Sequence, residues 1–392
     1  MKSARFPAMW GAVAALTVWM TASFATGADL APLPQLPVLG SPSGVTPTPA
    51  PSPSWVSAKV TLSPTVTVAA KPGSINILWP TPNKAFMDGG DISTWVQPTA
   101  SGDPHSGLFG CVRDNDSRFH EGIDIKCIER DKKGNPLDAV SAVMDGEVVY
   151  FNNVAGNGDY GRYIVLEHPR ADVAVYTLYA HLSAIAPGLK VGKIVAAGEV
   201  IGTMGHSGTE DIPLERAHLH FEIGLRLSDD FQSFYIDKKY PGKNEHGNYN
   251  GINLFGSDPQ AFFEAVRSGK FKNFADYFRA IPTAFTLRVT TTTIPDFAKR
   301  YPALLTKPVP SGGVTGWDID FTWYGMPKTM TPLPPGTLGL GAPGMVAILS
   351  DDKAQFIGCT CRDTLLFPTG KATTPKIGAY LLDAVRMLFR FK

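Results

Sequence analysis

The chain has 392 residues and carries 36 basic against 35 acidic side chains, which argues against a strongly basic surface for nucleic acid or anionic membranes. Glycine (39) and proline (33) are frequent and only 18% of the residues are charged, a mixture that favours short strands and turns over long helices. We therefore expect a mainly β protein, long enough for two or three domains, with no nucleic-acid partner.

Residues 1–28 have the pattern of a signal peptide. Lys2 and Arg5 precede an uncharged run that ends in small residues such as Ala25 and Gly27. An uncleaved membrane anchor is the alternative, because roughly 20 uncharged residues could span a bilayer. The small residues favour cleavage, so we expect an exported protein, periplasmic or extracellular, without stable membrane insertion.

A proline-rich linker is expected over residues 29–57. No charged residue occurs from Leu30 to Ala58, and eight prolines fall between Pro32 and Pro53. Such a stretch cannot bury a core and favours an extended, polyproline-like spacer.

Two folded parts are expected to follow the linker. Residues 58–225 alternate apolar and polar side chains between glycine-containing turns, which indicates a β domain with additional strands at its start. Residues 226–392 form an extension of unknown role that contains both strands and helices. The strands expected in the first part include residues 75–79, 143–151, 163–167, 173–179 and 219–223. In the extension we expect a helix that begins at Asp258 and Pro259, strands at 285–289 and 319–323, and a last helix with Ile377, Leu381, Ala384, Val385 and Leu388 on one face.

Four cysteines allow more than one arrangement. In an exported protein they can form disulfides, and Cys111 with Cys127 is the first expectation. The alternative is a thiolate zinc site, which is disfavoured because Cys359 and Cys361 lack the usual two-residue spacer. Sequence alone does not give the connectivity.

Four of the eight histidines fall in three short motifs of the expected β domain. The motifs are Phe119-His120-Glu121-Gly122-Ile123-Asp124, Tyr179-Ala180-His181-Leu182 and Ala217-His218-Leu219-His220-Phe221-Glu222.

The spacing of these motifs indicates a metal site on a sheet. Residues two apart in a strand share a face, so His218 and His220 point to one side. His120 and Asp124 would lie roughly 13 Å apart on a straight strand, so the chain must bend between them to bind one ion, and Gly122 is where it can bend. Three ligands from His120, Asp124 and His220 leave a fourth tetrahedral position for water, which is typical of a catalytic zinc site.

The order of the motifs resembles the M23 peptidases, which have the lysostaphin/LytM-like fold. The pattern HxGxD, Tyr-x-His and His-Leu-His-Phe-Glu carries the resemblance, and it extends over framework residues from about Trp79 to Gly224, including Phe109-Gly110 with Arg113 and the glycine-rich run before the last motif. It implies an antiparallel β-sheet catalytic domain (duplicated hybrid motif) with a β-rich α+β C-terminal extension.

The resemblance also implies a chemistry. The family's zinc ligands fall on His120, Asp124 and His220, and its two catalytic histidines fall on His181 and His218. The implied activity is that of a secreted zinc metalloendopeptidase, with one catalytic zinc that activates water to hydrolyse peptide cross-links of bacterial peptidoglycan. Bonds from D-alanine to a diamino acid are the first expectation and glycine bridges the second. Which histidine acts as base or acid stays open.

Several alternatives are compatible with the sequence. Related LytM-type proteins that lack the ligands regulate cell-wall amidases, but all five site residues are present here. A third possibility makes residues 226–392 the main functional module. Glu222 could hold a histidine or be a solvated carboxylate, and His168 is expected to be structural. His105, His206 and His246 are expected in loops, with His206 near the cleft.

Overall fold

The computed structural model describes residues 75, 77–169, 171–209, 212–337, 341–356, 361–367 and 374–391. The expected signal peptide (1–28) and linker (29–57) lie outside the described residues, as do the strands expected before residue 75 and Cys359. The described residues belong to one compact unit. Within these ranges no helix is both long and apolar enough to cross a membrane.

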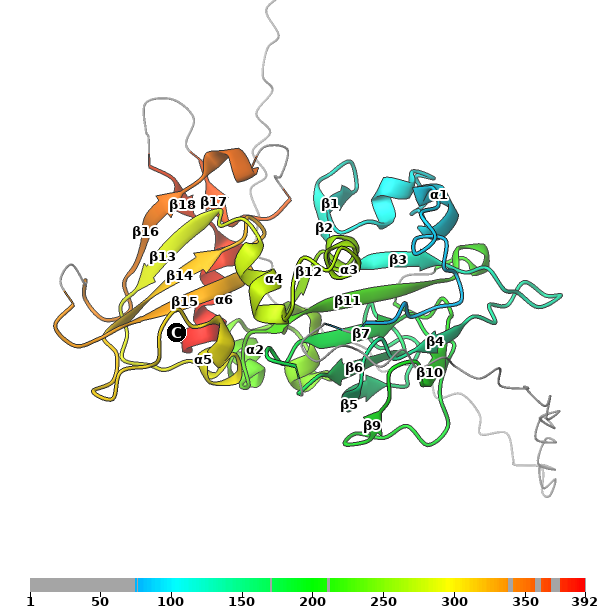
Figure 1. Ribbon diagram of the computed structural model, residues 1–392, viewed down its shortest axis with the longest axis horizontal. Helices are drawn as coiled ribbons and strands as arrows, with labels where there is room; N and C mark the ends of the chain where they lie inside the picture. Colours follow the sequence, from blue (N-terminus) through cyan, green and yellow to red (C-terminus); the bar gives the residue numbers. More distant parts are fainter. Residues whose placement is uncertain are drawn as a thin grey trace, which may run out of the picture. The chain divides into compact units, whose positions relative to one another are not determined.

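The described chain is mostly antiparallel sheet with a few helices (Figure 1), as the expected fold class requires. The strands are β1 Gly110–Arg113, β2 Arg118–His120, β3 Ile123–Lys126, β4 Ala139–Ser141, β5 Gly146–Asn152, β6 Tyr163–Glu167, β7 Tyr176–Ala180, β8 Ala184–Ile185, β9 Ile194–Val195, β10 Val200–Thr203, β11 His218–Arg226, β12 Leu254–Ser257, β13 Phe285–Val289, β14 Gly316–Phe321, β15 Pro327–Leu333, β16 Val346–Asp351, β17 Leu365–Leu366 and β18 Lys376–Ile377. The helices are α1 Ile92–Trp95, α2 Phe231–Asp237, α3 Pro259–Arg267, α4 Phe274–Ala280, α5 Asp296–Arg300 and α6 Ala379–Phe389.

Strand β11 is central to the main sheet. The sheet has the order β12-β11-β7-β6-β5-β9, and β3 also pairs with β11. On one side β11 pairs with β7, and on the other it pairs first with β3 and then with β12. Figure 1 shows β3, β11, β7, β6 and β5 side by side in this order. Every residue of β11 is buried, because the strand has neighbours on both edges and packing on both faces.

The two faces of this sheet have different roles. Alternate residues point to opposite faces of a strand, so the positions of β6, β7 and β11 divide into two sets. One set, which includes Ile164, Leu166, Leu219, Phe221 and Ile223, belongs to the large hydrophobic core. The other face carries a smaller cluster of buried residues: Tyr163, Val165, Tyr176, Leu178, Ala180 and Leu254. By the same alternation His218, His220 and Glu222 lie on this second face.

Smaller sheets complete the molecule. Strands β1 and β2 form a separate hairpin, and β4, β10 and β8 form a three-stranded sheet. In the C-terminal part of the chain, which follows residue 225, four strands form an antiparallel sheet in the order β15-β14-β13-β16. The expected helix start is confirmed, because Asp258 accepts a hydrogen bond from the Ala261 amide and Pro259 opens α3.

Some expected strands and helix positions need correction. The described residues 75 and 77–79 do not form a strand: the Leu78 amide donates to the Val143 carbonyl (2.8 Å), while Trp79 packs among aromatic rings instead of extending a ladder. The strand expected at 319–323 ends at Phe321, because a turn follows in which the Gly325 amide donates to the Thr322 carbonyl. Ile377 belongs to β18, since the last helix begins at Ala379.

The part after residue 225 continues the main sheet. β11 ends at Arg226, and β12 from the later part of the chain pairs with its second half. The expected boundary between residues 225 and 226 therefore falls inside β11. That the two sides of this boundary are separate domains stays a prediction.

The expected disulfide between Cys111 and Cys127 is wrong. Cys111 is joined to Cys361, 250 residues away, with Cα atoms 5.7 Å apart. Cys127 is a buried free cysteine whose Sγ lies 3.3 Å from the Glu129 carbonyl oxygen. The short separation in sequence favoured pairing Cys111 with Cys127. In the structure Cys111 lies on the separate β1–β2 hairpin, next to the C-terminal part of the chain that contains Cys361.

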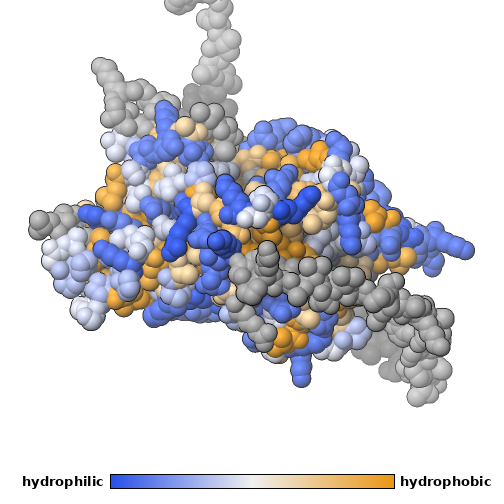
Figure 2. All heavy atoms as spheres, in the orientation of Figure 1, coloured by the Kyte–Doolittle hydropathy of each residue, from blue (hydrophilic) through white to orange (hydrophobic). Residues whose placement is uncertain are grey.

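Hydrophilic and hydrophobic residues are interspersed on the face shown in Figure 2. The large hydrophobic side chains that are more than half exposed include Val154, Val191 and Ile236, which belong to different segments of the fold. Scattered exposed residues of this kind are normal for a folded protein.

Candidate metal centre and its cleft

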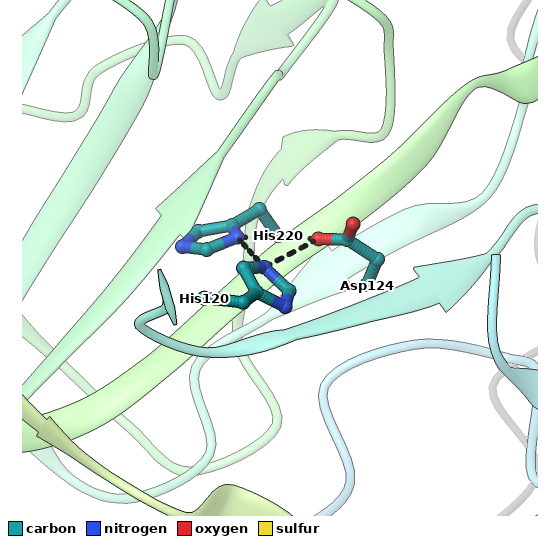
Figure 3. A group of neighbouring side chains, drawn as sticks. All are labelled: His120, Asp124 and His220. Carbon is teal, nitrogen blue, oxygen red and sulfur yellow. Dashed lines mark hydrogen bonds and ion pairs between the residues drawn. The ribbon is translucent and has the colours of Figure 1, made fainter. Parts of the chain in front are cut away.

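Three side chains meet where β2, β3 and β11 come together (Figure 3). His120 is the last residue of β2, Asp124 lies in β3 and His220 in β11. The register of the sheet pairs Asp124 directly with His220. The chain bends between β2 and β3 at Gly122, as expected, and a side chain there would put Cβ 2.3 Å from the Phe221 carbonyl oxygen. The bend and the register together bring residues from distant parts of the sequence to one point.

The facing atoms of the three residues are about equally spaced. His120 Nε2 lies 2.9 Å from His220 Nδ1, and each of these nitrogens lies 3.2 Å from Asp124 Oδ1. All three side chains are buried. Among the described residues this is the one group of three or more His, Cys, Asp or Glu side chains close enough to share a metal ion.

The spacing fits a tetrahedral zinc ion. Bonds from zinc to histidine nitrogen and carboxylate oxygen are ~2.0–2.2 Å, so two ligands of a tetrahedral ion are separated by about 3.3–3.5 Å. The observed separations of 2.9 and 3.2 Å need only a small expansion. Two imidazoles and one carboxylate also match the ligand types that catalytic zinc prefers.

Hydrogen bonds outside the cluster decide which ring nitrogen is available. His120 Nδ1 donates to the Leu108 carbonyl oxygen (2.7 Å), which leaves the Nε2 lone pair toward the centre. His220 Nε2 donates to Glu222 Oε1 (2.9 Å), which turns Nδ1 toward the centre. Such outer partners orient metal-binding histidines and fix their tautomers.

Glu222 is a fully buried carboxylate, so its interpretation as a solvated strand-end residue is wrong. Besides His220 it accepts hydrogen bonds from the Tyr160 hydroxyl (2.5 Å) and the Tyr176 hydroxyl (2.7 Å). Three donors compensate the burial of this charge. Burial alone would lower the pKa of His220, but hydrogen bonds to Asp124 and Glu222 raise it to about 9. A bound metal ion would replace the proton on Nδ1.

Arg113 supplies positive charge on the other side of the centre. Its guanidinium pairs with Asp124 Oδ2, and Nη2 also donates to His120 Nε2 (2.8 Å). Burial by itself would raise the pKa of Asp124, but Arg113 and the neighbouring histidines hold it well below its usual value. The carboxylate therefore stays ionised near neutral pH. The three facing atoms, His120 Nε2, His220 Nδ1 and Asp124 Oδ1, are thus balanced by positive charge from the Arg113 guanidinium and from a proton on His220. A bound metal cation would supply this positive charge in their place.

The other two motif histidines stand beside this centre. His218 Nε2 lies 3.5 Å from Asp124 Oδ1, and the rings of His181 and His218 are 4.8 Å apart. The Nδ1 atoms of His218 and His181 donate to the Arg216 and Ser207 carbonyl oxygens respectively, both at 2.8 Å. Each ring is thus left with Nε2 as its free nitrogen.

His181 also has an uncommon backbone conformation. Its φ is +60°, in the left-handed region that residues other than glycine seldom adopt. The residue follows β7 directly and its amide donates to the Tyr160 carbonyl (3.0 Å). Strain of this kind is concentrated at functional sites. Burial first, and then the neighbouring histidines, lower the pKa of His181 well below its usual value, and burial also lowers that of His218.

All five motif residues line a cleft of about 1210 Å³. One part of its wall comes from residues 98–121 and another from residues 157–160. Nine residues that follow residue 225 also line it: Tyr240, His246, Asn250, Gly251, Ile252, Arg362, Tyr380, Asp383 and Met387. The cleft is therefore not confined to the residues of the three motifs.

The remaining histidines have other places. His168 is buried, with Nδ1 bonded to the Asp145 carbonyl and Nε2 2.9 Å from Thr177 Oγ1, so it is structural as expected. His105 is exposed and pairs with Asp103. His206 Nδ1 donates to the Ile212 carbonyl (2.8 Å), and His206 is not among the residues that line the cleft. His246 does line it, which the sequence did not indicate.

Sequence reasoning missed four contributions to this site. Arg113, Tyr160 and Tyr176 were framework residues or ordinary strand residues in the sequence, yet they contact Asp124 or Glu222. Arg362 lies 238 residues from Asp124 in sequence and carries no motif, so nothing in the pattern could place it at the cleft. For Tyr176 the sequence offered one signal: it lies in an expected strand, which pairs in the structure with the strand that carries His218 and His220.

Comparison with solved structures finds similar chains among bacterial peptidases. A mutant of the catalytic domain of the prophage-encoded M23 protein EnpA from Enterococcus faecalis is 20% identical over 33% of this chain and 80% of that one, with a TM-score of 0.25. The catalytic domain of lysostaphin from Staphylococcus simulans is 22% identical over 40% and 89%, with a TM-score of 0.26. A zinc-containing peptidase from Vibrio cholerae is 22% identical over 39% and 34%, with a TM-score of 0.21.

A comparison with curated proteins gave no match. A comparison with family models matches residues 118–230 to the model described as Peptidase family M23. The matched segment contains His120, Asp124, His181, His218 and His220 and includes the whole of β11. Residues 118–230 of this chain are therefore similar to peptidase family M23.

Proposed function

We propose that this protein is an exported zinc metalloendopeptidase that hydrolyses peptide cross-links of bacterial peptidoglycan. The observation that carries the proposal is the convergence of His120 Nε2, His220 Nδ1 and Asp124 Oδ1 within 2.9–3.2 Å of one another in the cleft. The match of residues 118–230 to the model of peptidase family M23 supports the same conclusion.

His120, Asp124 and His220 would hold the zinc ion. When bound, zinc supplies a Lewis acid that polarises a carbonyl group and makes water a nucleophile near neutral pH. The Leu108 carbonyl and the Glu222 carboxylate keep the two imidazole rings turned so that one nitrogen of each faces the ion's position. Arg113 holds the second oxygen of Asp124, which leaves Oδ1 as the coordinating atom. The guanidinium would have to release His120 Nε2, because the metal and this hydrogen bond require the same lone pair.

His181 and His218 would move the protons of the reaction. Both rings keep a proton on Nδ1 through a backbone carbonyl and present Nε2 without one. Their lowered pKa values keep both neutral near pH 7, so either can accept a proton from water. The protonated ring can then pass that proton to the leaving amine as the peptide bond breaks. Two positioned histidines therefore provide both proton transfers that amide hydrolysis needs.

The shape of the cleft favours an extended peptide. Its walls come from several segments, and the metal centre lies among the residues that line it. An extended chain presents its carbonyl groups outward, whereas a folded substrate would have to open locally to reach the centre. We propose cross-links from D-alanine to a diamino acid as the first substrate and glycine bridges as the second.

The experiment that tests this proposal is digestion of purified peptidoglycan. Walls of several cross-link chemistries are incubated with the zinc-loaded protein, and the soluble products are identified by mass spectrometry. We expect products with new amino groups at a cross-link. Digestion of casein or elastin without release of wall peptides would show that the substrate class is wrong.

The same assay separates an enzyme from a regulator. A non-catalytic LytM-type regulator of an amidase would release no product alone but would increase product release when a cell-wall amidase is added. The presence of all five site residues favours the enzyme.

The ligand assignment is tested by two substitutions. His120→Ala and His220→Ala should each lower bound zinc sharply in elemental analysis, because two protein ligands do not hold zinc as well as three. Full zinc occupancy in either variant would mean that the ligands are assigned wrongly.

A further inference from the structure

The hairpin of β1 and β2 carries one candidate ligand and lies outside the main sheet. Asp124 and His220 belong to strands that pair with each other, so the main sheet fixes their separation. His120 ends β2, and β2 pairs only with β1 among the described strands. The position of His120 therefore depends on what holds this hairpin in place.

Two consecutive residues of the C-terminal part hold the hairpin. Cys361 forms a disulfide with Cys111 of β1. Arg362, the next residue, contacts β2 and the residue that follows it: its guanidinium lies 3.6 Å from the centre of the Phe119 ring, and Nη2 donates to Glu121 Oε1 (2.7 Å). One strand is tied covalently and the other by an ion pair and a cation–π contact.

The contacts of Arg362 bracket His120. Phe119 and Glu121 are its two neighbours in sequence, and both are held by the same guanidinium. Arg362 is itself fixed, because its side chain is only 10% exposed and lies 4.4 Å from the centre of the Tyr380 ring. Nη1 also donates to the Tyr380 hydroxyl group. The planar guanidinium makes these contacts in different directions, which an ammonium group could not reproduce.

We propose that Arg362 is a positioning residue for the candidate metal centre, through which the C-terminal part of the chain sets the place of His120. This inference rests on the proposed zinc site. Arg362 does not touch the three ligands. It acts by restraining the residues on either side of His120, so that Nε2 stays at the distance from His220 and Asp124 that a metal ion requires.

The experiment measures zinc affinity and the spectrum of the cobalt-substituted protein. Arg362→Ala, Arg362→Met and Arg362→Lys are compared with the wild-type full chain by competition with a chelator of known affinity. Loss of an interaction that orients a metal ligand typically lowers metal affinity ~10–100-fold, and we expect this for Arg362→Ala and Arg362→Met. The Co²⁺ absorption bands should change in position or intensity, because they report the arrangement of the ligands. Arg362→Lys should recover only part of the affinity.

Arg288→Ala is the matched control. Arg288 forms a bidentate pair with Asp318 between β13 and β14, so its removal deletes an arginine–carboxylate pair from the same C-terminal part of the chain. Arg288 is not among the residues that line the cleft. We expect this variant to keep wild-type zinc affinity and an unchanged Co²⁺ spectrum.

Three results would overturn the inference. Arg362→Met with wild-type zinc affinity and spectrum would show that Arg362 does not position His120, while the proposed zinc site would stand. An equal loss of affinity in Arg288→Ala would show a general loss of stability instead. Failure of the wild-type protein to bind zinc would refute both this inference and the proposed function. Should Arg362→Ala not fold, Arg362→Met keeps the test open, since it retains an aliphatic stem in this largely buried position.

Discussion

At the scale of single residues, the hydrogen-bond partner of one ring nitrogen decides which nitrogen of each motif histidine is free to face the centre. Backbone carbonyls hold the Nδ1 protons of His120, His181 and His218, whereas the Glu222 carboxylate holds Nε2 of His220. The difference explains why His220 faces the centre through Nδ1 and the other three through Nε2. The sequence motif indicated which histidines would meet, but it could not indicate which nitrogen of each would be free.

The two histidines proposed to transfer protons, His181 and His218, should be separable from the proposed metal ligands. In His181→Ala and His218→Ala we expect zinc content to remain and turnover to fall by ~10²–10⁴, the usual effect of losing a general acid or base. Elemental analysis and the rate of product release from peptidoglycan measure the two quantities. Normal turnover in either variant would remove that histidine from the mechanism.

His168 should make stability depend on pH. Burial lowers its pKa from 6.5 to about 4. Because the folded pKa is below the unfolded one, the unfolded state binds more protons between these values, and stability is lost as pH falls from about 6.5 toward 4. A difference of this size corresponds to ~3 kcal/mol at most.

The measurement for His168 is urea unfolding of the wild type and His168→Gln at several pH values. We expect the variant to be less stable at pH 7, because it loses packing and hydrogen bonds, but to lose less stability between pH 6.5 and 4. Parallel pH profiles for the two proteins would show that another group is responsible.

At the scale of elements, alternation in the sequence predicted the strands that carry the site well. The strand expected at 163–167 is β6, and the one expected at 219–223 lies within β11. The errors occur where tertiary contacts decide the outcome. Residues 75–79 alternate like a strand in the sequence, but Trp79 packs against Phe86 and Phe263, and the described residues 77–79 form no strand. Alternation of apolar and polar residues indicates which side chains are buried, but it does not indicate whether a neighbouring strand is present for pairing.

Gly122 connects two elements and should not tolerate a side chain. A Cβ atom there would lie 2.3 Å from the Phe221 carbonyl oxygen and 3.0 Å from Glu222 Cγ. Gly122→Ala would push β3 away from β11 and separate Asp124 from His220, so we expect a loss of about 1–3 kcal/mol in stability, typical of overpacking, together with weaker zinc binding.

Gly312→Ala is the control for this change, because a Cβ atom at Gly312 would meet nothing within 4 Å. Urea unfolding and chelator competition are applied to both variants. Equal stability and equal zinc affinity of Gly122→Ala and the wild type would show that the strands can separate here without cost.

At the scale of the whole molecule, the part after residue 225 is joined to the site by more than sequence continuity. β12 pairs with the strand that carries His218 and His220, Cys361 is bonded to Cys111, and Arg362 reaches Glu121. The sequence could predict that this part is folded, because its helices and strands have clear patterns. It could not predict these long-range contacts, since a cysteine pattern allows several pairings and a single arginine has no pattern.

The disulfide should contribute to stability. Closing a loop of about 250 residues is worth ~5 kcal/mol in the chain-entropy model. Peptide mapping without reduction should link Cys111 to Cys361, and the double variant Cys111→Ala/Cys361→Ala should unfold at lower urea concentration.

Cys127→Ala is the control for cysteine replacement. Burial raises the pKa of the Cys127 thiol to about 11, so this thiol should also react slowly with alkylating reagents in the folded protein. Reducing agent should lower the unfolding midpoint of the wild type and of Cys127→Ala, and should not change that of the double variant. A peptide linking Cys111 to Cys127 would contradict this pairing.

We propose that one zinc ion held by His120, Asp124 and His220 enables the chain to hydrolyse peptidoglycan cross-links. The most direct measurement is stepwise return of zinc to the metal-depleted full chain, with bound zinc and release of cross-link peptides followed in the same samples. We predict that activity rises in proportion to bound zinc and stops rising at one zinc per chain, and that His220→Ala shows neither change. Full hydrolysis by the metal-depleted protein, or one tightly bound zinc without any cross-link cleavage, would contradict the account.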